Sequence, residues 1–491
     1  MIPITQVPVH FDFVPVLHFW PSNPFDLYPA VLVFDKIVHF LQELIDRISS
    51  TLELASAQIS LERIHLTVFT PTRLITPGEF CWHQTFMSWR IHLLQPETLP
   101  ELQLVQSLTV ENGAELSPTN AWLQQPSVHK IDWRAIVVIA AKLPPLEILE
   151  CRIGGDEWPS TLDDLGSHYA HDWEGPRRES RRDFTEALAK LILPSLRQID
   201  MDFISPYSQA KSLDHRKALP NLVLPHQYDM LSSGLRLLSY LLRRMNLRGV
   251  FDLTLFWPVD DTTSPPLSPC LKSLIVVFDP SMPTGAWYFK GLRNESGATE
   301  GFEVTEVHYP PLTKTTEDED MDERADEYPW DVVTAAKFRV VPDDVTLVPL
   351  IRAFGKAMGS SMPALKEAVL WSPLEIRASN ISPFYEDCTG QELVHRGKPI
   401  LYELAWSLAY TAPNVKHVIY CEESLSVRAL WWWTGHRWRP DTDLRALFQK
   451  VGSDQHGEGL STIGAIRFMA MASCISPFLK EDLGPEVTVQ K

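Results

Sequence analysis

Residues 144–152 read PPLEILECR, and this phrase returns four more times along the chain. Each copy begins with a proline; the second residue after the proline is aliphatic, the third is charged and the fifth is apolar. The copies start at Pro144, Pro194, Pro269, Pro363 and Pro413. A recurring unit of this kind is typical of solenoids, which stack similar units along one axis. The phrase predicts an architecture and names no ligand or reaction.

Apolar residues stand at the second, fifth and seventh positions after each proline. From the fifth position onward the spacing is two, the period of a strand with one buried face. The proline precedes the strand, where its missing N–H removes no hydrogen bond from the sheet. The residues expected to face inward are Leu146, Leu149, Cys151, Leu196, Ile199, Met201, Leu271, Leu274, Val276, Leu365, Ala368, Leu370, Val415, Val418 and Tyr420.

Four of the copies follow a stretch with apolar residues at three- and four-residue spacing, which predicts a helix. These stretches are residues 133–142, 182–192, 350–358 and 401–410, whereas a proline-rich loop, residues 264–269, precedes the third copy. The polar residues 162–182 are expected to be an exposed loop. Successive units of helix, proline turn and strand predict parallel strands joined by right-handed crossovers.

The intervals between the five prolines lie near multiples of about 25 residues, a length typical of leucine-rich repeats. Residues 64–68, 104–110 and 247–256 are candidates for strands of units that have lost the phrase. We therefore predict an α/β fold, an irregular leucine-rich-repeat-like solenoid of helix–strand units with a parallel sheet. An ordinary α/β domain with proline-initiated strands is the alternative.

Three segments are expected along the chain. Residues 1–60, with an amphipathic helix at 34–48, form an N-terminal helical or capping segment; residues 61–475 form the solenoid; residues 476–491 form a flexible tail. Within the solenoid, residues 317–327 hold eight acidic residues and one arginine. Such a block repels itself, so a disordered loop is expected at about 313–329.

The net charge of −18 excludes a general nucleic-acid binder and a protein that adheres to anionic membranes. A local basic patch, such as Arg177 and Arg178 with Arg181 and Arg182, stays compatible with that charge. No segment of the sequence reaches the length of an uninterrupted apolar membrane span, and no secretory signal is expected. Its six cysteines form no spaced framework, so a cytoplasmic or nuclear location is expected.

No motif indicates catalysis, a cofactor or a metal. Paired zinc ligands at short spacing, a nucleophile elbow and glycine-rich phosphate loops are all missing from the sequence. His417 and Cys421 share one face of an expected strand, which favours a plain strand face. Trp431, Trp432 and Trp433 cannot all face one side, so they predict either a partially exposed surface or a cap on the last repeat.

Two phrases give the chain a family resemblance. Residues 231–258 end in Leu255-Phe256-Trp257-Pro258, and a strand is followed by residues 283–289, PTGAWYF. With residues 181–184 (RRDF) and 438–441 (WRPD), these phrases resemble a group of filamentous-fungal proteins related to F-box and leucine-rich-repeat proteins, over roughly residues 100–460. The resemblance implies a repeat body, but the Leu-Pro-x-Glu opening of an F-box is not found.

The outward positions of the strands are the expected binding surface for a partner protein. They carry charges in the early units and apolar residues in the later ones, with Asp200, Asp202, Glu367, Trp371 and His417 as the candidate partner-binding residues. The function expected is a non-enzymatic interaction scaffold. One alternative is a substrate receptor that binds a ubiquitin-ligase adaptor through residues 34–48; another is an enzyme with an unrecognised site.

Overall fold

The computed structural model describes residues 64–69, 72–73, 99, 101–103, 105–111, 127–128, 132–153, 173–191, 193–204, 213–259, 268–291, 295, 297–309, 336–378, 400–416, 424–433 and 438–464. Ten strands form the main sheet: β1 (Ile64–Phe69), β3 (Val105–Glu111), β5 (Ile148–Arg152), β6 (Gln198–Asp202), β8 (Arg244–Gly249), β9 (Ser273–Phe278), β13 (Glu367–Ala378), β14 (Ile400–Thr411), β15 (Arg428–Trp433) and β16 (Leu460–Gly464). The helices are α3 (Trp133–Ala141), α4 (Glu174–Lys190), α6 (Met230–Leu238), α8 (Asp344–Ser360), α10 (Thr442–Gln449) and the short α11 (Ser453–His456).

Short elements complete the described fold. Three two-stranded sheets pair β2 (Thr72–Arg73) with β4 (Ser127–Val128), β7 (Pro220–Asn221) with β11 (Phe302–Glu303), and β10 (Phe289–Gly291) with β12 (Arg339–Pro342). Single 3₁₀ turns are η3 (Ser239–Leu241), η4 (Leu253–Leu255) and η5 (Glu306–His308).

The strands of the main sheet lie side by side in the order in which the chain makes them. Every neighbouring pair is parallel except the two pairs that contain β14, which runs antiparallel to β13 and to β15. The fold is therefore mixed α/β, with a large and mostly parallel open sheet.

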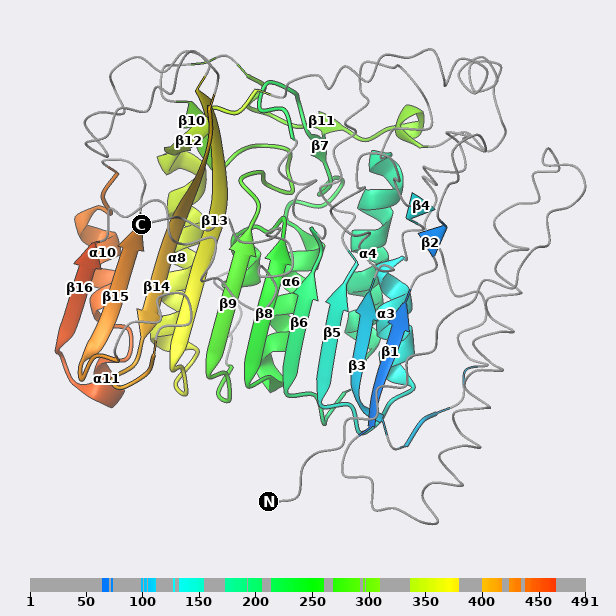
Figure 1. Cartoon of the computed structure of the whole chain (residues 1–491), viewed down its shortest axis with the longest axis horizontal. Coiled ribbons are helices and arrows are strands. Elements are labelled where there is room, and N and C mark those ends of the chain that lie inside the picture. Colours follow the sequence, from blue (N-terminus) through cyan, green and yellow to red (C-terminus); the bar gives the residue numbers. More distant parts are fainter. Residues whose placement is uncertain are drawn as a thin grey trace, which may run out of the picture.

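The long helices α3, α4, α6 and α8 lie on one side of this sheet (Figure 1). Consecutive helices contact one another, from α3 to α4 and from α4 to α6. Four helices begin in the same way, because an aspartate at each N-cap accepts a hydrogen bond from a backbone N–H of the first turn. These caps are Asp132, Asp229, Asp343 and Asp441.

The proline phrase folds into one recurring turn. In all five copies, the N–H of the second residue after the proline donates to the carbonyl oxygen of the residue that precedes the proline, at 3.0 to 3.3 Å. This is a β-turn with proline at its second position, where the fixed φ of proline is favoured. A sixth copy lacks the proline: Leu242 N–H donates to Ser239 O at 3.1 Å, with Tyr240 in the proline position. The strand of this unit is β8, which overlaps the strand expected at 247–256 only at residues 247–249, because the chain then leaves the sheet and forms η4.

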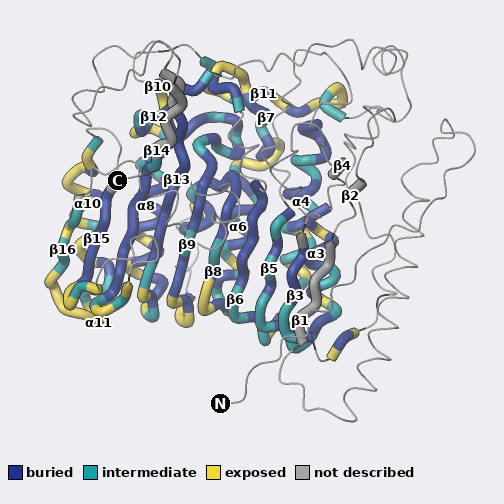
Figure 2. Tube along the Cα trace, in the orientation of Figure 1, coloured by how far each residue is buried: buried dark blue, intermediate teal, exposed yellow. Residues whose placement is uncertain are grey.

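The inward positions of the phrase form the core between sheet and helices. The predicted residues that the structure describes in the first four copies are each at most 4% exposed and belong to one hydrophobic cluster. The sixth copy adds Leu242, Met245 and Leu247 to the same cluster. Figure 2 shows the middle strands buried along most of their length, with exposed chain gathered at the loops below the strand starts. The predicted alternation is confirmed in the first four copies; in the fifth, Val415 is half-buried and Val418 and Tyr420 lie outside the described residues.

Two local predictions are wrong. Residues 401–410, expected to be a helix, lie within strand β14, because that segment pairs with β13 and β15 and buries residues on both faces of the sheet. Trp406 contributes to the core on the helix side, and Ala409 to a second cluster on the other side. Residues 174–181, expected to be loop, form the first turns of α4.

The remaining predicted elements are either confirmed or lie outside the described residues. The helices at 133–142, 182–192 and 350–358 are confirmed as parts of α3, α4 and α8, and the strands at 64–68 and 104–110 as β1 and β3. The N-terminal helix at 34–48, the acidic loop, residues 417–421 of the fifth copy and the tail lie outside the described residues.

The PTGAWYF phrase closes a tight turn that anchors β10. Gly285 has φ +80°, and a Cβ there would lie 2.4 Å from Gly301 Cα, so only glycine fits. Trp287, Tyr288 and Phe289 follow the turn and are buried. The Tyr288 hydroxyl donates to Phe251 O at 2.7 Å and ties this segment to the chain after β8.

Candidate interaction face of the sheet

The outward positions of neighbouring strands line up into rows across the sheet. One row joins Thr109, Glu150, Asp200 and Asn246 through the registers of β3, β5, β6 and β8. The next row joins Arg152, Asp202 and Arg248. These side chains lie on the face opposite the core, because their sequence neighbours Leu149, Cys151, Ile199 and Met201 are in the core cluster.

The polar rows are bonded internally. Arg248 Nη1 donates to Asp202 Oδ2 at 2.9 Å, Asn246 Nδ2 to Asp200 Oδ2 at 3.2 Å, and Thr109 Oγ1 to Glu150 Oε2 at 3.2 Å. Asp200 and Asp202 are 7% and 5% exposed, so both are buried. Each pair bridges two adjacent strands: two pairs join β6 to β8, and one joins β3 to β5.

Burial changes the chemistry of Asp200. Desolvation, together with the neighbouring Glu150 and Asp202 carboxylates, raises the pKa of Asp200 to about 8, although the hydrogen bond from Asn246 opposes this shift. On the opposite face, burial raises the pKa of the Cys151 thiol well above its ordinary value. Such a thiol is a poor nucleophile.

The later strands carry an apolar cluster on the same outward face. Its buried members are Ile204, Val277, Val369, Trp371, Ala409, Ala429 and Trp431. Trp431 belongs to this cluster, whereas Trp432 faces the helix side and packs against Phe448 with ring centroids 5.4 Å apart. The two tryptophans therefore occupy opposite faces of β15 and are both buried, so the partially exposed surface that the sequence allowed is not found for this pair.

The predicted partner-binding residues do not form one common site in the structure. Asp200 and Asp202 lie in the polar rows and Trp371 in the apolar cluster, and all three are buried. Glu367 is half-buried at the start of β13, where its Oε1 accepts from Ser273 Oγ at 2.7 Å. His417 lies outside the described residues. The structure gives the two aspartates an internal role, and their role toward a partner stays a prediction.

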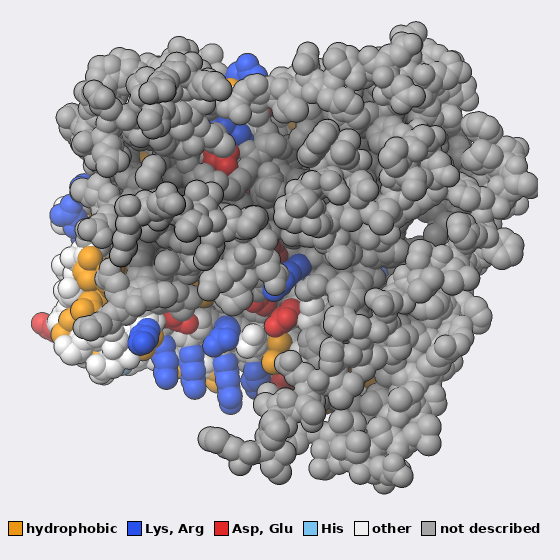
Figure 3. Space-filling model, in the orientation of Figure 1, with side chains coloured by type: hydrophobic (Ala, Val, Ile, Leu, Met, Phe, Trp, Pro, Cys, Tyr) orange, Lys and Arg blue, Asp and Glu red, His pale blue; other side chains and the backbone are white. Residues whose placement is uncertain are grey.

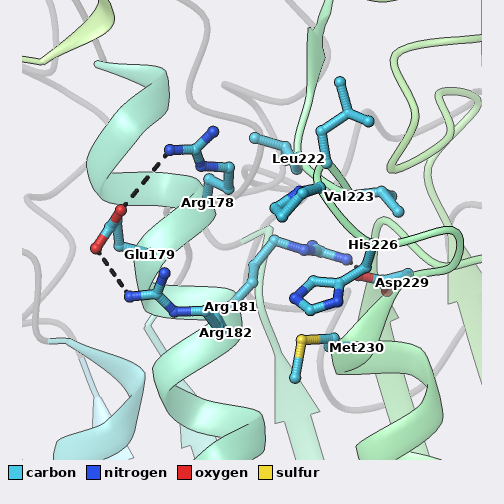
Figure 4. Close-up of a pocket in the computed structure, with 11 residues that line it drawn as sticks. Arg178, Glu179, Arg181, Arg182, Leu222, Val223, His226, Asp229 and Met230 are labelled. Atoms are coloured by element: carbon cyan, nitrogen blue, oxygen red, sulfur yellow. Dashed lines mark hydrogen bonds and ion pairs between the residues drawn. The ribbon is translucent and has the colours of Figure 1, made fainter. Parts of the chain in front are cut away.

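A second candidate lies on the helix side, between α4 and residues 222–230 (Figure 4). It is a pocket of about 90 Å³. Arg178 donates to Tyr309 Oη at 2.8 Å, and Arg182 pairs with Glu179 at 3.2 Å. The Arg181 side chain points toward Asp229 (Figure 4). Its Nη2 lies 2.8 Å from Asp229 Oδ2, and both side chains are 2% exposed. Arg178, Arg181 and Arg182 of the suggested basic patch are thus engaged within the protein.

The floor of this pocket is a buried polar network that the sequence did not reveal. Asp229 Oδ2 accepts from Arg181, from Ser232 N–H at 2.9 Å and from Ser232 Oγ at 2.6 Å. Asp252 Oδ2 accepts from Asp229 N–H at 3.0 Å. Burial and the nearby Asp229 carboxylate raise the pKa of Asp252 to about 6. The network locks α4 and α6 to the segment that follows β8, which explains the buried arginine of the RRDF phrase.

The described residues show neither a metal site nor a membrane-spanning helix. There, no group of three or more His, Cys, Asp or Glu side chains is placed to hold a metal ion. In the same part of the chain, no helix combines the length and the apolar character that a membrane crossing needs. Cys388, Cys421 and His436 lie outside it.

Comparisons of the chain with protein-family models, with curated proteins and with solved structures find no match.

Proposed function

We propose that this protein is a non-enzymatic protein-interaction scaffold built on an irregular leucine-rich-repeat-like solenoid. The observation that carries the proposal is the strand order, which follows the chain through all ten described strands of the main sheet. With helices on one side only, each unit contacts mainly the units before and after it (Figure 1). Bodies of this kind offer long surfaces to partners.

The strand order also disfavours the usual site of an α/β enzyme. Doubly wound sheets bind ligands where the strand order reverses, because the connections there leave to opposite sides and open a crevice. Among the described strands the order never reverses. The antiparallel β14 is a hairpin partner of β13 and opens no such crevice.

The recurring turn supports the same proposal. Six units share one turn geometry and a charged third position, and five of them share one inward set of apolar residues, which is the regularity of a repeat protein. The resemblance of the LFWP and PTGAWYF phrases to fungal F-box and leucine-rich-repeat relatives agrees with it.

Affinity purification of the tagged full chain from a filamentous-fungal host, followed by chemical cross-linking and mass spectrometry, tests the proposal. We expect one or a few stoichiometric partners with cross-links to the strand-bearing body. Recovery of a cullin with its adaptor would instead assign the chain to ubiquitin-ligase receptors. A preparation without any stoichiometric partner would overturn the scaffold role.

A further inference from the structure

The third position after the proline is charged in every copy of the repeat phrase. These side chains belong neither to the hydrophobic core nor to the polar rows, so their charge needs another explanation. In the structure this position is the residue directly before each strand. It is Arg197 before β6, Arg243 before β8, Lys272 before β9 and Lys366 before β13. These four residues are called the basic row.

Main-chain hydrogen bonds place the four residues next to one another. Arg243 N–H donates to Arg197 O at 2.7 Å, Lys272 N–H to Arg243 O at 2.8 Å, and Lys366 N–H to Lys272 O at 2.8 Å. Neighbouring strands lie about 4.8 Å apart, so the row extends over roughly 14 Å. Glu147 O accepts from Arg197 N–H, so an acidic residue precedes the row.

Three of the four charges of the row are exposed to solvent, whereas Arg197 Nη1 donates to Pro194 O at 2.7 Å and to Leu196 O at 2.8 Å within its own turn. Arg243, Lys272 and Lys366 are exposed and Arg197 is half-buried. Figure 3 shows Lys and Arg side chains gathered along the lower edge of the sheet. Among the described residues, no ion pair involves Arg243, Lys272 or Lys366. Like charges on adjacent strands repel each other, and an anionic partner would remove that repulsion.

We propose that the basic row docks a short acidic segment of a partner protein, an inference that rests on the scaffold function proposed above. The chain carries a net charge of −18, so the row is a local exception on an acidic protein. A long polyanion would extend beyond the row onto acidic surface. Salt screens electrostatic interactions beyond about 8 Å, so a short acidic segment interacts with the charges of the row alone. An extended peptide rises about 3.3 Å per residue, so four or five residues cover the row.

A pocket at one end of the row gives the segment an anchor. It has a volume of about 340 Å³, and Leu365, the neighbour of Lys366, lines it together with Met358, Met362 and Val451. Lys450 and Asp454, which carry opposite charges, also line it, so the pocket contributes apolar contact and the row contributes the positive charge. We assign to this pocket one large apolar residue that follows the acidic run, because a buried anchor supplies affinity that surface charges lack.

The test is fluorescence anisotropy of labelled peptides with the full chain. The probe peptide reads Glu-Asp-Glu-Asp-Phe, and its neutral counterpart reads Gln-Asn-Gln-Asn-Phe. We expect the acidic peptide to bind, to weaken as salt rises, and to weaken again when glycine replaces its phenylalanine. The neutral peptide should bind at least tenfold more weakly.

Charge reversal locates the site. Lys272→Glu with Lys366→Glu should weaken binding of the acidic peptide at least tenfold, whereas Lys272→Arg with Lys366→Arg should stay within about twofold of the wild type. The matched control reverses two exposed charges elsewhere, Arg134→Glu on α3 and Lys290→Glu on β10, with the same change in net charge. This control should bind like the wild type.

Three outcomes would overturn the inference: no binding of the acidic peptide, equal weakening by the control pair, or tighter binding of anionic vesicles or a short oligonucleotide than of the peptide. Each leaves the scaffold function standing if the affinity purification recovers a stoichiometric partner. The two failures are therefore separable.

Discussion

Arg248 and Asp202 form an ion pair between adjacent strands, with Nη1 and Oδ2 2.9 Å apart and both side chains 7% exposed. The pair lies on the face of the sheet opposite the helices, where it joins β8 to β6. A buried charge that loses its partner is strongly destabilising, and the free energy of unfolding should fall by about 3–5 kcal/mol in Arg248→Ala. Urea unfolding monitored by circular dichroism measures this loss.

The double variant Arg248→Met with Asp202→Leu removes both charges and keeps apolar volume. It should recover most of the stability lost by Arg248→Ala. A loss below about 1 kcal/mol in the single variant would show that the pair is not a buried cross-strand contact.

Asp200 should make stability depend on pH. Its folded pKa of about 8 lies above the unfolded value near 3.9, so the folded state binds more protons between these limits. The contribution of Asp200 to stability is thus fully present below about pH 4 and is lost as the pH rises toward 8. Asp200→Asn should reduce the fall in the urea midpoint between pH 5 and pH 8, and Asp443→Asn on the exposed surface of α10 should not. Equal slopes in Asp200→Asn and the wild type would contradict this assignment.

Two glycines should respond in opposite directions to alanine. At Gly285 the positive φ and the close approach of Gly301 leave no space for a Cβ, so Gly285→Ala should cost about 2 kcal/mol or more. At Gly359, within α8, a Cβ meets nothing within 4 Å, and Gly359→Ala should add about 0.5–1 kcal/mol. Thermal unfolding of both variants tests the turn; a tolerated alanine at residue 285 would refute it.

Two described cysteines should differ in reactivity. Cys151 is buried beneath the polar rows and its thiol pKa is raised, whereas Cys270 is exposed. Under native conditions, iodoacetamide should label Cys270 rapidly and Cys151 only after unfolding. Peptide mapping by mass spectrometry reads both sites, and rapid labelling of Cys151 in the folded protein would mean that β5 is not in the core.

The repeat phrase predicted the part of the fold that depends on local pattern. Turn chemistry at each proline and the alternation after it settle which side chains face inward, so the core positions from Leu146 to Leu370 were identified from the sequence. The sixth copy of the phrase was not predicted from the sequence because Tyr240 replaces the proline. The apolar pattern at Leu242, Met245 and Leu247 could have revealed it.

The wrong helix prediction at residues 401–410 has a physical cause in tertiary pairing. Residues 401–410 have good helix formers at helical spacing, but pairing with two neighbouring strands overrides that propensity. Tertiary pairing also buries Trp431 and Trp432 on opposite faces of one strand.

The candidate site was harder to predict than the fold. The outward positions of Asp200 and Asp202 follow from alternation, but their burial and the Arg248 contact depend on β8, whose unit the phrase does not mark. The network of Arg181, Asp229 and Asp252 joins residues far apart in sequence and leaves no short motif. The charged third position was visible in the sequence, whereas its alignment into the basic row required the strand order.

The measurement that tests the account most directly is parallel affinity purification of three full-length proteins: the wild type, Lys272→Glu with Lys366→Glu, and the control Arg134→Glu with Lys290→Glu. The account predicts a stoichiometric partner with the wild type and the control, and its loss from the variant of the basic row. A wild-type protein that purifies without any stoichiometric partner would contradict the claim that this chain is an interaction scaffold.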